Sequence, residues 1–135
     1  LLQMDLEDMT LSNTLNGTTA TGFDLVVAAD VLVYFGDLGN IIQVYSNLVP
    51  AESSSWLVFS CERASPEEAP LGFRLMPSGR FAHTKEHVLT MAGKVGYELV
   101  DYKEITPRIE KGEPVKGHLF VFETKKAAGK SSNEL

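Results

Sequence analysis

The stretch Phe23-Asp24-Leu25-Val26-Val27-Ala28-Ala29-Asp30-Val31-Leu32-Val33-Tyr34-Phe35 decides the fold of this chain. Apolar residues run without alternation over residues 25–29, and a carboxylate, Asp30, follows where the run ends. A run of this kind, bounded by turn residues, is typical of a parallel strand that is buried on both faces. In open α/β sheets the ligand lies outside the carboxyl ends of such strands. We therefore expect the chemistry of the protein in residues 28–35.

Composition limits the classes of function. The chain has 135 residues and a net charge of −6, which fits at most one domain. Its charges are interspersed, so we expect no nucleic-acid binding, and no apolar run is long enough to suggest a membrane contact. The single cysteine, Cys61, fits a reducing, cytoplasmic compartment. Because the chain begins Leu1-Leu2-Gln3 without an initiator methionine, we expect it to be a piece of a longer protein.

Helical and strand patterns alternate on either side of the central strand, which is expected over residues 23–29. The first predicted elements are a short strand end that runs into an acidic turn over residues 2–9, the central strand, a helix over 38–49 with Asp37 as N-cap, and a strand over 56–61. A long loop with a small hairpin over 62–82 and a helix from Thr84 to Gly96 follow. The last predicted elements are a strand over 99–105, a charged loop over 107–116 and a strand over 117–123. This alternation predicts a doubly wound α/β sheet, and the two consecutive final strands predict an antiparallel finish. Residues 125–135 are expected to be a disordered polar tail.

Three stretches carry a family resemblance. They are residues 23–34, the segment Gly96-Tyr97-Glu98-Leu99, and Leu75-Met76-Pro77-Ser78-Gly79-Arg80-Phe81-Ala82-His83-Thr84 together with residues 117–121. Their order resembles the carboxyl-terminal half of class I S-adenosylmethionine-dependent methyltransferases, most of all the small-molecule type that is often joined to tetratricopeptide repeats. The resemblance covers residues 1–124 and implies a mostly parallel Rossmann-like sheet with an antiparallel last strand. It also implies S-adenosylmethionine as cofactor, a small-molecule or protein acceptor, and upstream tetratricopeptide repeats.

The resemblance implies cofactor contacts at five residues. Asp5 matches an acidic residue that accepts a hydrogen bond from the adenine amino group, and the backbone N–H of Leu6 would meet the ring. Ala28 and Ala29 match small strand-end residues that approach the methionine part of the cofactor, and Tyr34 is expected to line the pocket. The residues alone leave other roles open, since an aspartate also caps turns and alanine is ordinary core.

Two residues are candidates for catalysis. Asp30 could orient the substrate, bind the ammonium group of the cofactor or act as a base, or it could accept the N–H groups of the following turn. His83 lies at a predicted helix start, where the positive end of the helix dipole would lower its pKa and favour a neutral base, although a structural histidine is more common. Arg80 could bind a substrate carboxylate or be solvated. No metal site is expected.

The glycine-rich turn that such enzymes use for the cofactor has no counterpart here, because Gly72, Gly79, Gly93 and Gly96 are scattered. We therefore expect this chain to be inactive alone and marginally stable, with the apolar edge of the central strand exposed. The expected function of the parent protein is methyl transfer from S-adenosylmethionine. A nucleotide-binding α/β oxidoreductase domain and a non-catalytic scaffold derived from a methyltransferase stay open as alternatives.

Overall fold

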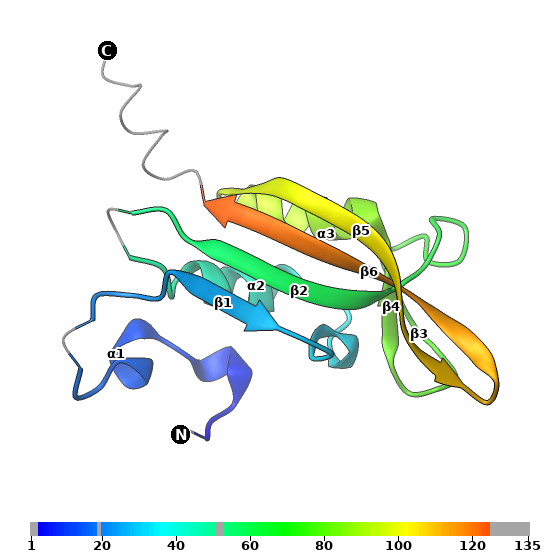
Figure 1. Ribbon diagram of the computed structural model, residues 1–135, viewed down its shortest axis with the longest axis horizontal. Helices are drawn as coiled ribbons and strands as arrows, with labels where there is room; N and C mark the ends of the chain where they lie inside the picture. Colours follow the sequence, from blue (N-terminus) through cyan, green and yellow to red (C-terminus); the bar gives the residue numbers. More distant parts are fainter. Residues whose placement is uncertain (1–2, 19, 51–52, 125–135) are drawn as a thin grey trace, which may run out of the picture.

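The apolar run that follows Asp24 forms an edge strand of a six-stranded mixed sheet (Figure 1). The computed structural model describes residues 3–18, 20–50 and 53–124. In chain order its elements are η1 (Leu6–Asp8), α1 (Leu11–Thr14), β1 (Leu25–Ala28), η2 (Leu32–Tyr34), α2 (Gly39–Ser46), β2 (Trp56–Arg63), β3 (Phe73–Leu75), β4 (Phe81–His83), α3 (Lys85–Lys94), β5 (Tyr97–Glu110) and β6 (Glu113–Thr124).

Strand β2 is the centre of the sheet. On one side it pairs in parallel with β1 along its first half and with β4 at its last two residues. On the other side it pairs antiparallel with β6, which in turn pairs with β5, while β3 and β4 form a small antiparallel hairpin. This arrangement confirms the expected α/β class and the antiparallel last strand.

Helices α2 and α3 cover one face of the sheet and create the core there (Figure 1). Apolar residues of α2 recur at helical spacing, so Ile41, Ile42 and Tyr45 all point toward the sheet and are buried. From the strands, Phe59, Phe120 and Phe122 pack with ring centroids 5.4 to 5.8 Å apart. None of the helices among the described residues is long and apolar enough to span a membrane.

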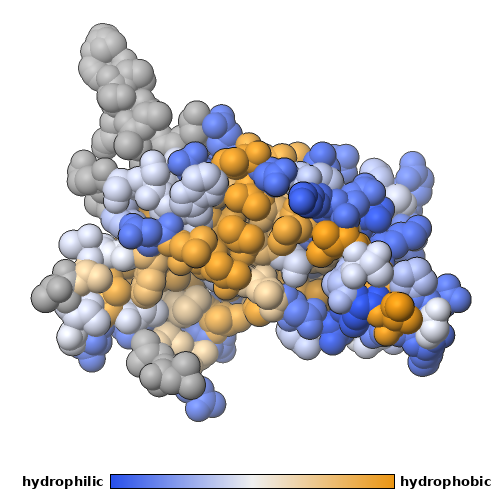
Figure 2. Space-filling model, viewed as in Figure 1, coloured by the Kyte–Doolittle hydropathy of each residue, from blue (hydrophilic) through white to orange (hydrophobic). Residues whose placement is uncertain are grey.

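The opposite face of the sheet is largely open. Leu25 is 55% exposed, Val27 60% and Trp56 39%. Figure 2 shows apolar residues gathered across the middle of this face. The expectation that residues 23–29 are buried on both faces is therefore wrong for this chain, because none of the described helices packs on the second face. The expectation of an exposed apolar edge is confirmed.

The predicted charged loop over residues 107–116 is instead the end of a long β5–β6 hairpin. The turn between the two strands is Lys111-Gly112, with φ of 51° and 81°. Two successive residues in the left-handed region match the twist of a two-residue hairpin, which allows the strands to continue to the turn. Pro107 is accommodated at a register shift between Ile105 and Arg108. It packs closely on Gly117, where an added Cβ would lie 2.8 Å from Pro107 Cδ.

Helix boundaries also differ from expectation in two places. Helix α2 has Leu38, not Asp37, at its N-cap position, although Asp37 Oδ1 accepts a hydrogen bond from the N–H of Gly39 at 2.8 Å. Residues 3–6 form no strand end, because the chain turns into η1 there. Thr84 does cap α3, as expected, and accepts from the N–H of His87 at 3.1 Å. The predicted tail at residues 125–135 lies outside the described residues.

Candidate functional site

The parallel strands β1 and β2 have their carboxyl ends on the same side of the sheet, and polar residues come together at these strand ends. Asp30 follows β1 with a φ of 57°, a left-handed conformation that aspartate tolerates better than most residues. Its N–H donates to Ser60 Oγ on β2 at 3.2 Å. Glu62 lies two residues further along β2 and is buried. The site therefore contains two carboxylates, one exposed and one buried.

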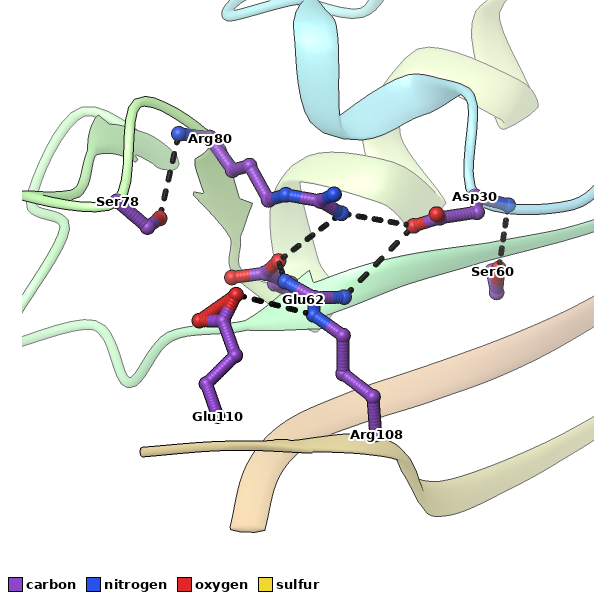
Figure 3. Close-up of polar contacts among 7 residues, drawn as sticks. All are labelled: Asp30, Ser60, Glu62, Ser78, Arg80, Arg108 and Glu110. Atoms are coloured by element: carbon purple, nitrogen blue, oxygen red, sulfur yellow. Dashed lines mark hydrogen bonds and ion pairs between the residues drawn. The ribbon is translucent and has the colours of Figure 1, made fainter. Parts of the chain in front are cut away.

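Two arginines from separate hairpins bind these carboxylates (Figure 3). Arg80, just before β4, donates from Nη1 to Asp30 Oδ1 at 3.1 Å and lies 3.9 Å from Glu62 Oε2. Arg108, on β5, donates to Glu62 and has its Nη1 3.7 Å from Asp30 Oδ1. Arg108 also donates from Nε to Glu110 at 3.2 Å. Arg80 is therefore ion-paired and not a solvated hairpin residue.

This network connects the strand ends that carry Asp30 and Glu62 to the β3–β4 hairpin and to the β5–β6 hairpin. Burial makes an unpaired carboxylate costly, so the Arg108 guanidinium stabilises Glu62 by a charge-assisted hydrogen bond. The same hydrogen bond raises the pKa of Arg108. Asp30 keeps 59% of its side chain exposed, so one carboxylate of the network remains accessible to a ligand. Of the two predicted catalytic residues, Asp30 and His83, Asp30 is the one that solvent can reach.

Tyr34 lies beside the network on η2 and is 62% exposed. The guanidinium carbon of Arg80 lies 5.8 Å from the centre of the Tyr34 ring, within the range of a cation–π contact. An aromatic ring, an accessible carboxylate and two arginines therefore share one edge of the sheet. Such a set can orient a polar or aromatic ligand.

His83 is separated from solvent. It is fully buried, and its Nε2 donates to the backbone oxygens of Phe35 and Gly36 at 2.8 and 3.0 Å. Burial, more than any other effect, lowers its pKa to about 4. The expected direction of the pKa shift is therefore present, but burial rather than the helix dipole is its main cause. Because the ring has no exposed surface, the geometry does not support its predicted role as a base.

An apolar groove of about 270 Å³ runs along the free edge of β1. Leu6 forms one wall and Ala28 the other, so two of the predicted cofactor contacts face the same space. Ala29 follows β1 at the exposed strand end. Asp5 caps η1, and its Oδ1 accepts from the N–H of Glu7 at 3.3 Å, which is the structural role that its sequence left open.

Sequence reasoning missed Glu62, Arg108 and His87. Glu62 carried a signal, because it ends a buried strand that runs parallel to the one ending at Asp30. Arg108 carried none, since its segment was expected to be a loop. His87 accepts from the N–H of Leu38 at 3.1 Å and so connects α3 to the start of α2.

Comparison with known proteins identifies the fold of the chain through solved structures, whereas comparison of its sequence finds no match. No protein-family model matches the sequence, and no curated protein matches it. Among solved structures, an S-adenosylmethionine-dependent methyltransferase from Methanosarcina mazei matches with a TM-score of 0.63 and 13% identity, over 90% of this chain and 65% of that one.

Two further structures show the range of activities on this fold. Magnesium protoporphyrin IX methyltransferase from Synechocystis PCC 6803, with bound SAH, matches with a TM-score of 0.60 and 15% identity, over 91% of this chain and 49% of its own. The [4+2]-cyclase SpnF matches with a TM-score of 0.61 and 11% identity, over 90% of this chain and 55% of its own. The chain therefore has the fold of class I S-adenosylmethionine-dependent methyltransferases and spans about half to two thirds of the length of these structures.

Proposed function

We propose that this chain is the carboxyl-terminal part of a domain that transfers a methyl group from S-adenosylmethionine to an acceptor. The observation that supports this most is the match of 90% of the chain to a methyltransferase structure, with Asp30 at the strand end where such folds bind ligands. The match to a cyclase shows that the fold alone does not fix the reaction.

The residues present fit part of a cofactor site. The groove between Leu6 and Ala28 is apolar and beside a sheet edge, as an adenine ring requires. Asp5 would accept from the adenine amino group, and the small side chain of Ala29 permits close approach to the methionine part. S-adenosylmethionine supplies an already activated methyl group, so the protein has mainly to align the acceptor and exclude water.

On this proposal Asp30 and Tyr34 orient the acceptor, and Arg80 and Arg108 fix the position of the Asp30 carboxylate. We favour a small-molecule acceptor, because one structural neighbour is named for magnesium protoporphyrin IX and because Tyr34 and Asp30 are both exposed beside the carboxyl end of β1. The chain alone should be inactive, since the glycine-rich turn of the family has no match in its sequence. A cytoplasmic location and upstream tetratricopeptide repeats remain predictions that fractionation and sequencing of the cellular polypeptide test.

Calorimetric titration with S-adenosylhomocysteine tests the proposal. We expect saturable micromolar binding to the polypeptide at the length that the cell makes, and no heat from the 135-residue chain. In the longer polypeptide Asp5→Asn should weaken binding about tenfold, equivalent to about 1.4 kcal/mol, whereas Asp8→Asn, on the neighbouring exposed acid, should not.

A second assay separates transfer from binding. Extracts supplied with the polypeptide and radiolabelled S-adenosylmethionine should gain label in the small-molecule fraction. Label in the protein fraction would instead indicate a protein acceptor. Binding without transfer would favour the scaffold, and binding of a nicotinamide dinucleotide in place of S-adenosylhomocysteine would favour the oxidoreductase.

A further inference from the structure

Two histidines hold the backbone of residues 35–38, which directly follow Tyr34. His83, at the end of β4, donates from Nε2 to two backbone oxygens of this segment at 2.8 and 3.0 Å. His87, on α3, accepts at Nε2 from the N–H of Leu38 at 3.1 Å. Both rings are buried, and they stack with their centroids 6.1 Å apart. The segment is therefore attached to β4 and α3 through its own backbone atoms.

The same part of the chain also contacts the residues before this segment. Arg80, just before β4, donates to Asp30 at 3.1 Å, and its guanidinium carbon lies 5.8 Å from the centre of the Tyr34 ring. Residues 80–87 therefore contact residues 30–38 on both sides of η2. A change at one of these contacts is transmitted to the others over a few residues.

The hydrogen-bond partners assign opposite tautomers to the two rings. Because backbone oxygens accept from His83, its Nε2 carries the proton. Because Leu38 donates to His87, Nε2 of that ring carries no proton. Protonation of His87 at Nε2 would place two N–H groups against each other. The hydrogen bond to Leu38 therefore exists while the His87 ring is neutral and is lost when the ring is charged.

Asp37 gives a protonated His87 ring a different partner. Its Oδ1 lies 3.9 Å from His87 Nε2, and its side chain is 63% exposed, so little packing opposes a closer approach. The other titratable groups that face the ring are His83, on β4, and Lys94, on its own helix. The residues of β3 and of the turn before it that contact the ring carry no charge. Burial, as the largest effect, and Lys94 lower the pKa of His87, whereas Asp37 raises it.

We propose that His87 is a positioning residue for the strand end that carries Asp30 and Tyr34, and that protonation of its ring releases the backbone at Leu38. In the charged state the ring pairs with Asp37, and the segment after Tyr34 keeps its contacts to β4 alone. The release follows from the geometry of these contacts. Its effect on ligands rests on the proposed function, in which Asp30 and Tyr34 orient the acceptor. Acceptor binding would then weaken as the pH falls below about 6.5.

NMR spectroscopy of the 135-residue chain from about pH 7.5 to about pH 5 tests the proposal. A scalar coupling across the N–H···N hydrogen bond between Leu38 and His87 detects the contact directly. We expect this coupling at the high pH and its loss as the His87 ring titrates, with about a tenfold fall in the exchange protection of the Leu38 amide. The Tyr34 amide signal should shift with the same midpoint. The other two histidines have pKa values of about 4 and 3 and titrate at lower pH.

Substitutions of His87 separate protonation from packing. In His87→Gln the amide oxygen can accept from Leu38 but does not titrate, so Leu38 should stay protected and the Tyr34 signal should not respond to pH over this range. His87→Leu removes the acceptor and should leave Leu38 unprotected at every pH. A matched pair tests the surroundings of the ring. Asp37→Asn should lower the midpoint of His87, and Lys94→Gln should raise it.

Three results would overturn the proposal. The Leu38 amide could stay protected while His87 titrates, the Tyr34 signal could fail to follow the His87 midpoint, or His87→Gln could show the same pH response as the unsubstituted chain. The first two would separate His87 from the segment and from the strand end, and the third would assign the response to another group. None of these measurements uses S-adenosylhomocysteine or an acceptor, so their outcome is distinct from a failure of the proposed activity.

Discussion

The two faces of this sheet are built from similar residues but have different surroundings. On the helix-covered face Phe59, Phe120 and Phe122 are buried, whereas on the open face Leu25, Val27 and Trp56 are 39 to 60% exposed. Valine, leucine and tryptophan at alternating strand positions are as suited to burial as the phenylalanines opposite. The difference therefore lies in what covers each face, because among the described residues the helices α2 and α3 pack on the first face alone.

The largest expected effect contrasts the two faces directly. Phe120→Ala removes a ring at the centre of the covered face and should lower the free energy of unfolding by about 3–5 kcal/mol, enough to unfold a marginal domain. Val27→Ala on the open face should change it by less than about 0.5 kcal/mol. Urea denaturation followed by circular dichroism measures both. Equal losses would mean that the open face is already covered in the isolated chain.

A second prediction concerns how tightly Gly72 packs against helix α3. Gly72 has a φ of +95°, and an added Cβ would lie 2.7 Å from Cβ of His87 on α3. Gly79 has a φ of +87° with no atom within 4 Å of the added Cβ. Because both positions carry the same backbone strain, Gly72→Ala should cost about 1–3 kcal/mol more than Gly79→Ala. Similar melting temperatures for the two variants would argue against tight packing around His87.

A third prediction concerns the histidines beneath the covered face. Burial lowers the pKa of His83 to about 4 and that of His118 to about 3, below the ordinary value of about 6.5. Below pH 6.5 the unfolded chain therefore binds protons that the folded chain does not. Stability is complete above about pH 6.5 and falls toward pH 4, by about 1.4 kcal/mol per pH unit for each histidine. Denaturation at stepped pH should show a shallower fall for His83→Gln than for the unsubstituted chain, and identical slopes would refute the assignment.

The smallest expected effect lies at the edge beside the open face. Arg80→Gln removes an ion pair to the exposed Asp30 and should cost less than about 1 kcal/mol at low salt and almost nothing at 1 M salt. Arg74→Gln, on the exposed strand β3, is the matched control. A loss that salt leaves unchanged would show that Arg80 acts through packing.

The sequence was sufficient to predict the order of the main strands and helices from the central strand onward, because buried strands and the Thr84 cap are local signals. It failed where the outcome depends on residues far away in the chain. Unbroken apolar residues at 25–29 predict two covered faces, but only neighbours in space decide whether both covers are present. The Lys111-Gly112 hairpin turn was hidden because lysine is an unusual residue for the left-handed region.

The sequence likewise predicted one part of the candidate site and missed the rest. Asp30 at a strand end was found, since the carboxyl ends of parallel strands meet. Its partners Arg80 and Arg108 come from two hairpins whose positions depend on long-range pairing, so the sequence could not place them. The burial of His83 follows from the packing of β4 against the segment after η2 and against His87 of α3, which no local pattern indicates.

Hydrogen exchange of the β1 amides tests most directly the central proposal that this chain is part of a larger domain, in which β1 would be an inner strand. The measurement compares the 135-residue chain with the polypeptide at the length that the cell makes. We predict that Val26 and Val27 exchange rapidly in the chain alone, while Phe59 and Phe120 are protected, and that β1 becomes as protected as β2 in the longer polypeptide. Equal protection of β1 and β2 in the isolated chain, or no gain in the longer polypeptide, would contradict the account.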